Sequence, residues 1–372
     1  MKETSLNPAK KRNGTVDLMR FVFTLMVVAA HMISTYYLGG KQPPFANGHI
    51  SVELFFTLSG FLMARKAAAM PEDRALTGRA SRDFVRHKFA TLYPVWFTAL
   101  CATFLVRAFQ GSFTWDLLPR SATSFLMISS LGFRDGVNID YSYYIPIMLV
   151  CCALTFPFLY RFRRTFTLVI APLTAFFCAL YLFHTYGKIV VINGTADGGD
   201  WLPILGYPKM LRGLCGICLG CCAWELSDWM KARFSGCLTG AGRGLFTALE
   251  LLLWAIPILI IARAVHIYLQ LPLMLFFALA VAVSFADLGH TGTWLSGPFF
   301  GWLGRYSYAV YLSQFIPRNI LERFCPPENA RVFVPLYFAV NLVCGLVFLY
   351  VGELLRFLFR RAGAGLRRLC LK

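Results

Sequence analysis

The feature that most constrains this chain is a series of apolar runs, each about 20 residues long, separated by short basic segments. A helix of that length crosses the hydrocarbon core of a bilayer and satisfies its backbone hydrogen bonds internally. The runs lie at about 16–37, 49–65, 89–108, 141–160, 166–185, 203–223, 245–262, 271–287, 298–317 and 332–355. The sequence therefore predicts an all-α polytopic membrane protein with about ten transmembrane helices.

The composition excludes a soluble globular protein. Of the 372 residues, 58% are hydrophobic and only 15% are charged, whereas soluble domains are about half apolar and a quarter charged. We find no internal repeat and no low-complexity linker, so we expect one membrane domain over residues 14–355. A basic N-terminal tail (1–13) and a basic C-terminal tail (356–372) flank this domain, and no cleavable signal is predicted.

The formal net charge of +18 indicates membrane topology rather than nucleic-acid binding, because the basic residues lie between the apolar runs. About two thirds of the 36 Lys and Arg residues fall on one side if ten helices alternate in direction. The positive-inside rule assigns that side to the cytoplasm, so both termini are predicted to be cytoplasmic. The expected location is a bacterial inner (cell) membrane, with membrane lipids and no nucleic acid among the partners.

Most of the 12 cysteines lie inside apolar runs, where Cys behaves as a small hydrophobic residue. One cluster has a spacing that resembles a metal site: Cys215, Cys218, Cys221 and Cys222. The same helix carries Gly213, Gly216 and Gly220, so we favour a small-residue face that packs against another helix. Neither a metal site nor a disulfide framework is predicted.

Ionisable side chains inside apolar spans are costly and therefore mark functional sites. Arg20 and His31 in the first span are eleven residues apart, which places them on the same helical face, roughly 16 Å apart along the axis. Asp17 lies one turn before Arg20 and is placed to pair with it. His31 is either a hydrogen-bonded helix contact or a general base near neutral pH.

Glu53 lies in the first turns of the second span, at a depth that brings it near His31. It is either an interfacial carboxylate in contact with water or the group that orients the imidazole, as the third member of a triad does. Ser59 lies in the same span, but no nucleophile-elbow motif surrounds it, so helix packing is the better interpretation.

A basic stretch precedes Leu92-Tyr93-Pro94 and includes Arg82, Arg86 and Lys88. Such a cluster either binds phosphates or anchors the chain on anionic lipid. We interpret the C-terminal basic tail as a lipid anchor. Other intramembrane charges mark either a cavity or helix ends whose side chains reach the interface, namely Lys209, Arg212, Glu250 and Arg305.

The order of these motifs resembles the membrane acyltransferase-3 family over about residues 14–350. The residues that carry the resemblance are Arg20-x10-His31, Val52-Glu53-Leu-Phe-Phe-Thr-Leu-Ser-Gly-Phe61, the basic lead-in to Leu92-Tyr93-Pro94, and Leu303-Gly304-Arg305-Tyr306-Ser307-Tyr308-Ala-Val-Tyr311-Leu312. The resemblance implies O-acylation of a glycan or related hydroxyl compound by a cytoplasmic acyl-CoA, most simply acetyl-CoA. It also implies that Arg20 and His31 are the functional pair.

The chain departs from the family pattern at three places. Thr91 replaces a second cation before Tyr-Pro, so Arg82 and Arg86 are expected to take its role. Pro146 stands where the fourth span often has an acid, and Gln314 stands where the ninth span often ends in His. The family usually has Asp where this chain has Glu53, which keeps the charge and lengthens its reach.

We therefore predict a membrane O-acyltransferase with catalytic residues His31, Arg20 and Glu53. Arg82, Arg86 and Lys88, with Arg20, hold the phosphates of the acyl-CoA. His31 takes the proton of an acceptor hydroxyl or carries the acyl group as a relay, and the acceptor is a glycan or lipid-linked sugar. The alternatives are a transporter or flippase for a lipid-linked sugar or small anion, and a catalytically inactive relative.

Overall fold

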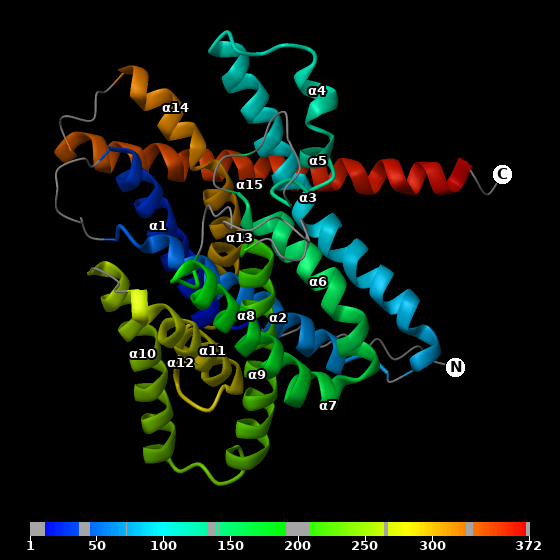
Figure 1. The fold of residues 1–372 in the computed structure, drawn as a ribbon, viewed down its shortest axis with the longest axis vertical. Helices are drawn as coiled ribbons and strands as arrows, with labels where there is room; N and C mark the ends of the chain where they lie inside the picture. The colour runs from blue at the N-terminus through cyan, green and yellow to red at the C-terminus, as the bar shows by residue number, and fades with distance from the viewer. Residues whose placement is uncertain are drawn as a thin grey trace.

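The computed structural model describes residues 12–36, 45–71, 73–131, 139, 142–190, 208–263, 267–324 and 330–369. Within these ranges every regular element is helical (Figure 1). The long helices are α1 (Gly14–Tyr36), α2 (Val52–Ala68), α3 (Thr77–Phe109), α6 (Tyr144–Arg161), α8 (Ala171–Tyr186), α9 (Pro208–Phe234), α10 (Gly240–Ala262), α11 (Gln270–Ala286), α13 (Pro298–Ser313) and α15 (Ala330–Leu369). The short elements are η1 (Gly48–Ser51), η2 (Arg74–Leu76), α4 (Leu117–Arg120), α5 (Ala122–Phe125), α7 (Arg163–Thr165), η3 (Phe166–Ile170), η4 (Ile267–Leu269), α12 (Thr291–Trp294) and α14 (Phe315–Phe324).

The long helices follow the order of the predicted apolar runs, which confirms the all-α membrane prediction. In the described part of the chain, 7 helical segments are long and apolar enough to cross a membrane: Gly14–Met32, Thr77–Phe109, Tyr144–Arg161, Arg163–Tyr186, Pro208–Phe234, Gly240–Ala262 and Val332–Ala362. The remaining three, α2, α11 and α13, have 17, 17 and 16 residues. The prediction that the chain crosses the membrane ten times, and the predicted cytoplasmic position of both termini, stay predictions.

The outer helix faces expose large apolar side chains, as expected where lipid is the solvent. Phe176 and Phe177 on α8 are each 60% exposed, and Leu245 on α10 is 71% exposed. Residues 1–11 and 370–372, which belong to the two predicted tails, lie outside the described residues. α15 continues through position 356 without a break (Figure 1).

α2 packs closely against α9 in the interior of the bundle. A side chain at Gly220 would overlap the carbonyl of Thr57 on α2, and one at Gly216 would overlap Phe56. Cys215, Cys218 and Cys221 are fully buried beside these glycines. The predicted small-residue packing face is therefore confirmed, and it allows the two backbones to approach closely.

Glu250 on α10 lies in a buried hydrogen-bond network. Its Oε1 accepts from the hydroxyl of Ser284 at 2.6 Å and its Oε2 accepts from the hydroxyl of Thr291. The indole nitrogen of Trp254 donates to Ser284 at 3.0 Å. Glu250 therefore joins α10, α11 and α12, and its side chain does not reach the interface.

Candidate functional site

A cavity of about 510 Å³ opens where the first residues of α1 meet the last turn of α2 and the basic part of α3. Basic side chains line its mouth: Arg12, Arg20, Lys66, His87, Lys88, Arg305 and Arg356. Glu353 is the acidic residue in the lining. Further in, the walls are largely apolar, with Phe55, Leu58, Met63, Ile145 and Met148. We call this the basic cavity, and it suits an anion with an apolar arm.

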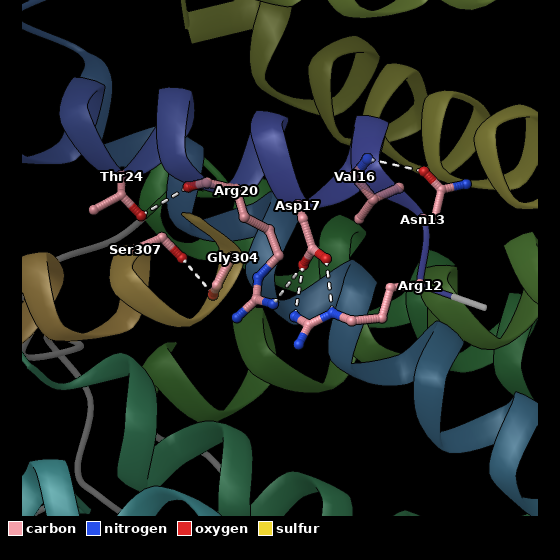
Figure 2. Close-up of polar contacts among 8 residues, drawn as sticks. All are labelled: Arg12, Asn13, Val16, Asp17, Arg20, Thr24, Gly304 and Ser307. Carbon is pink, nitrogen blue, oxygen red and sulfur yellow. Dashed lines mark hydrogen bonds and ion pairs between the residues drawn. The ribbon is translucent and has the colours of Figure 1, made fainter. Parts of the chain in front are cut away.

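Arg20 is held in the basic cavity by Asp17, as its one-turn spacing predicts. Its Nη1 lies 3.3 Å from Asp17 Oδ1, and Nε of Arg12 lies 3.0 Å from Asp17 Oδ2 (Figure 2). Asp17 is buried, whereas the Arg20 side chain keeps 28% of its surface exposed. One carboxylate shared by two guanidiniums leaves net positive charge at the mouth.

Gly304 on α13 allows this arrangement, because a methyl group there would overlap the Asp17 carboxylate (Figure 2). We expect Gly304→Ala to displace Asp17 and to lower the free energy of unfolding by about 1–3 kcal/mol. The matched control is Gly297→Ala at the start of the same helix, where an added methyl group meets no atom within 4 Å. Unfolding of the detergent-solubilised variants measures the difference, and equal stabilities would contradict the predicted clash.

A cation of α15, Arg356, lies beside Thr91. Arg356 Nη2 donates to the carbonyl of Thr91 at 2.8 Å, and both residues line the basic cavity. Lys88 lines the same cavity and lies over the ring of Phe84, 5.6 Å from its centroid. α15 thus brings the Arg356 side chain against α3, and interpretation of the C-terminal basic segment as a lipid anchor stays a prediction.

The other two predicted phosphate ligands lie elsewhere on α3. Arg82 is 74% exposed and its Nε is 3.8 Å from Asp83, its neighbour in sequence. Arg86 is also exposed, and neither Arg82 nor Arg86 is among the described residues that line the basic cavity. Their role in holding a donor stays a prediction.

His31 lies farther along α1, where Gln314 at the end of α13 contacts it. The imidazole Nδ1 is 2.8 Å from Oε1 of the Gln314 side chain. Gln314 is fully buried, and its carbonyl accepts from the hydroxyl of Tyr337 at 2.9 Å. Gln314, one of the residues at which the chain departs from the family pattern, thus contacts His31 directly.

Glu53 forms a fully buried ion pair with Arg212 of α9. Arg212 Nε donates to Glu53 Oε1 at 2.8 Å, and Nη2 donates to the same oxygen. Both side chains have no exposed surface. The Arg212 guanidinium carbon lies 5.6 Å from the ring centroid of Tyr143, and Lys209 Nζ lies 5.2 Å from it. The hydrogen bonds that the structure gives join Glu53 to Arg212 and His31 to Gln314, so orientation of His31 by Glu53 stays a prediction.

Two tyrosines lie at the inner end of the basic cavity. The rings of Tyr144 on α6 and Tyr311 on α13 have centroids 6.2 Å apart, and both side chains line the cavity. Ser59 lines it as well and is hydrogen-bonded to the Tyr144 hydroxyl at 3.0 Å. Gln314 follows Tyr311 by three residues, so the His31 contact lies just beyond this pair. On α13, the contact with His31 is thus about one helical turn away from the cavity lining.

The sequence motifs that carry the family resemblance meet at the basic cavity because α13 packs against both α1 and α15. The hydroxyl of Tyr308 donates to the carbonyl of Leu92 at 3.2 Å, which joins the ninth-span motif to the Leu92-Tyr93-Pro94 motif. Arg305 Nε lies 3.6 Å from Glu353 on α15, at the cavity mouth. Sequence reasoning missed Lys66, Arg356 and the contact between Gln314 and His31, since no local spacing connects helices so distant in the chain.

A family profile described as "Acyltransferase domain" matches residues 13–350. No curated protein and no solved structure matches the chain. The profile covers nearly the whole membrane domain and includes Arg20, His31, Glu53 and the ninth-span motif. The chain therefore belongs to the acyltransferase-3 family, and it is an integral membrane acyltransferase.

Proposed function

We propose that the protein transfers an acyl group, most simply acetyl, from acyl-CoA to a hydroxyl of a cell-surface glycan or lipid-linked sugar. The membrane would be a bacterial inner membrane, crossed ten times with both termini in the cytoplasm. The observation that carries the proposal is the basic cavity, which combines a cationic mouth with an apolar interior at the end that the charge distribution assigns to the cytoplasm. Membership of the acyltransferase family favours this function over solute transport.

The residues of the basic cavity fit an acyl-CoA donor. Its phosphates are anions that Arg and Lys bind by charge-assisted hydrogen bonds, and Arg20, Lys88 and Arg356 are placed at the mouth to do so. The uncharged arm that carries the thioester would enter between the apolar walls. CoA itself cannot cross hydrocarbon because of its charge, so only the acyl-bearing end approaches Tyr144 and Tyr311.

His31 is suited to act as the general base. With the Gln314 amide oriented so that Oε1 faces the ring, the imidazole donates from Nδ1 and keeps a lone pair on Nε2. Nε2 would take the proton of the acceptor hydroxyl as its oxygen attacks the thioester carbonyl. The carbon–sulfur bond then breaks, and the departing CoA thiolate receives the proton from His31. In the relay form of the mechanism, Nε2 attacks the thioester carbonyl and displaces the CoA thiolate. The acceptor hydroxyl then attacks the acyl-imidazolium, its proton passes to water, and the neutral imidazole is restored.

The function itself is tested with inside-out membrane vesicles from cells that express the chain. Radiolabelled acetyl-CoA is added outside these vesicles, on the cytoplasmic side of the protein, and base-labile label is measured in the carbohydrate fraction. We expect label above that of vesicles without the protein. Uptake of a solute without transfer of label would instead support a transporter.

Donor binding provides a sharper test of the basic cavity. We expect Arg356→Ala and Lys88→Ala each to raise the Kd of acetyl-CoA about tenfold, because each variant removes one charge-assisted contact. Arg82→Ala is the matched comparison, since Arg82 is exposed and paired with Asp83. Isothermal titration of the purified protein in detergent measures the three values. If only Arg82→Ala weakens binding, the donor site lies on the exposed face of α3 instead.

A further inference from the structure

A second cavity, of about 270 Å³, lies where the start of α1 meets the ends of α2, α9 and α11. Its lining combines aromatic rings with groups of both charges, and the mechanism above does not use it. We call it the side cavity and define it by Phe61, Arg65, Trp224, Asp228, Phe285 and Asp287.

A third cavity, of about 290 Å³, lies between the side cavity and the basic cavity. It shares Arg65 and Phe285 with the side cavity, and Arg20 and Lys66 with the basic cavity. Arg12 lines all of them. We call this third cavity the connecting passage. The three cavities therefore follow one another along the end of the bundle that the charge distribution assigns to the cytoplasm.

The connecting passage is more strongly cationic than the side cavity. Arg12, Arg20, Arg65 and Lys66 line the passage, and its described lining has one carboxylate, Asp17, which Arg12 and Arg20 share. Such a lining suits phosphate groups. The described lining of the side cavity has two carboxylates beside its cations, so it offers acceptors to a ligand that carries N–H or O–H donors.

Aromatic rings form the apolar part of the side cavity. Phe285 is stacked on Phe61, with ring centroids 4.3 Å apart, and the guanidinium carbon of Arg65 lies 5.5 Å from the Phe285 centroid. The Trp224 side chain lines the same cavity and is partly exposed. Nucleic-acid bases stack on aromatic rings and on arginine. Rings next to carboxylate acceptors therefore suit a planar base with an exocyclic amino group.

The walls of the side cavity are held in place by contacts between helices. Asn13 Nδ2 donates to the carbonyl of Ser284 at 2.6 Å, which ties the start of α1 to α11. Asp287 ends α11 with a φ of 55°, and a methyl group at Gly292 would overlap its Oδ1. The Asp287 carboxylate therefore lies directly over Gly292, and a ligand that binds here costs little in ordering of the protein.

We propose that the side cavity binds the nucleoside end of the acyl-CoA donor. The base stacks on the aromatic wall and its amino group donates to Asp228, while the ribose phosphate lies in the connecting passage beside Arg65 and Lys66. The diphosphate then lies at the mouth of the basic cavity with Arg20. The order of base, ribose phosphate, diphosphate and uncharged arm in CoA matches the order of the three cavities. The inference rests on the proposed acyl-CoA donor and locates its nucleotide.

Two ligands separate the side cavity from the rest of the donor site. Acetyl-CoA carries the nucleoside, whereas S-acetylphosphopantetheine has the same thioester arm and lacks the nucleoside. Trp224→Leu removes the indole ring. Its control is Trp229→Leu on the same helix, since Trp229 is 56% exposed and is not among the described residues that line the three cavities.

A second pair of variants tests the hydrogen bond to the base at an exposed position, where folding is not at risk. Asp228→Asn and Asp228→Leu both remove the negative charge, but only Asp228→Leu also removes the acceptor oxygen. Isothermal titration of the purified protein in detergent measures the Kd of both ligands for each variant. Thermal unfolding of the same samples checks that the variants are folded.

We expect Trp224→Leu to raise the Kd of acetyl-CoA about tenfold relative to the wild type, because stacking on the base is lost. Asp228→Leu should raise it about fivefold relative to Asp228→Asn, because one hydrogen bond is lost. Neither change should alter the Kd of S-acetylphosphopantetheine. Trp229→Leu should bind both ligands as the wild type does.

The outcomes distinguish failure of this subsite from failure of the proposed function. If the wild type binds neither ligand and labels no carbohydrate, the proposed function fails and the subsite fails with it. If the wild type transfers acyl groups but binds acetyl-CoA no more tightly than S-acetylphosphopantetheine, only the nucleoside subsite is overturned. Folded Trp224 and Asp228 variants that bind acetyl-CoA normally, or that lose both ligands equally, would also overturn it.

Discussion

Replacement of His31 by alanine is expected to lower the rate of acyl transfer by at least about a hundredfold while acetyl-CoA binding is unchanged. A positioned general base contributes a factor of roughly 10² to 10⁴, and the relay form of the mechanism loses transfer altogether. Donor binding should survive because His31 is not among the residues that line the basic cavity in the described structure. Vesicle labelling and the Kd of acetyl-CoA measure the two effects separately.

The matched control for His31→Ala is His184→Ala, since His184 is an exposed histidine on α8. It should leave both measurements at wild-type values. If His31→Ala transfers acyl groups at the normal rate, His31 is only a helix contact of Gln314 and the mechanism is wrong. If it weakens transfer and donor binding to the same degree, His31 acts on the donor and not as the base.

The second large effect is expected at the Glu53–Arg212 pair. Removal of either partner, by Glu53→Leu or Arg212→Met, should lower the free energy of unfolding by about 3–5 kcal/mol, because the remaining partner is an uncompensated buried charge. The double variant Glu53→Leu with Arg212→Met should recover most of that loss, since two apolar side chains then pack where the ion pair was. Titration with a denaturing detergent measures the four free energies.

A half-exposed ion pair provides the control for these single and double variants. Arg305 and Glu353 have side chains that are 47% and 43% exposed, and Arg305→Met should cost no more than about 1 kcal/mol. If the two single losses at Glu53 and Arg212 add in the double variant, the side chains do not stabilise each other. A double variant that is folded but inactive would show that the pair is needed for function as well as for stability.

The placement of Arg356 is not evident from the sequence of the C-terminal basic segment. Its positive charges have the sequence pattern of a lipid anchor, and composition alone does not separate Arg356 from the arginines that follow. The packing of α15 against α3 places Arg356 on the carbonyl of Thr91, 265 residues earlier in the chain. A cation from another helix therefore lies beside Thr91, the position at which the family resemblance led us to expect a cation in α3 itself.

The sequence by itself determined the properties that depend on neighbouring residues. Apolar runs determined the helical membrane fold because each helix satisfies its own backbone in lipid. Spacing along one helix predicted the Asp17–Arg20 pair, and the glycines of α9 predicted its packing face; both are confirmed.

Only the tertiary structure decided which helices are neighbours, and with them the partners of the buried charges. Arg212 meets Glu53, Gln314 meets His31, and Arg356 meets Thr91, each across a large separation in sequence. Hydropathy cannot predict these contacts, because a helix that is apolar on most of its surface can pack against several other helices with similar free energies. Small residues such as Gly220 and Gly304 select one arrangement by allowing close approach, and that arrangement places the charged groups around the candidate site.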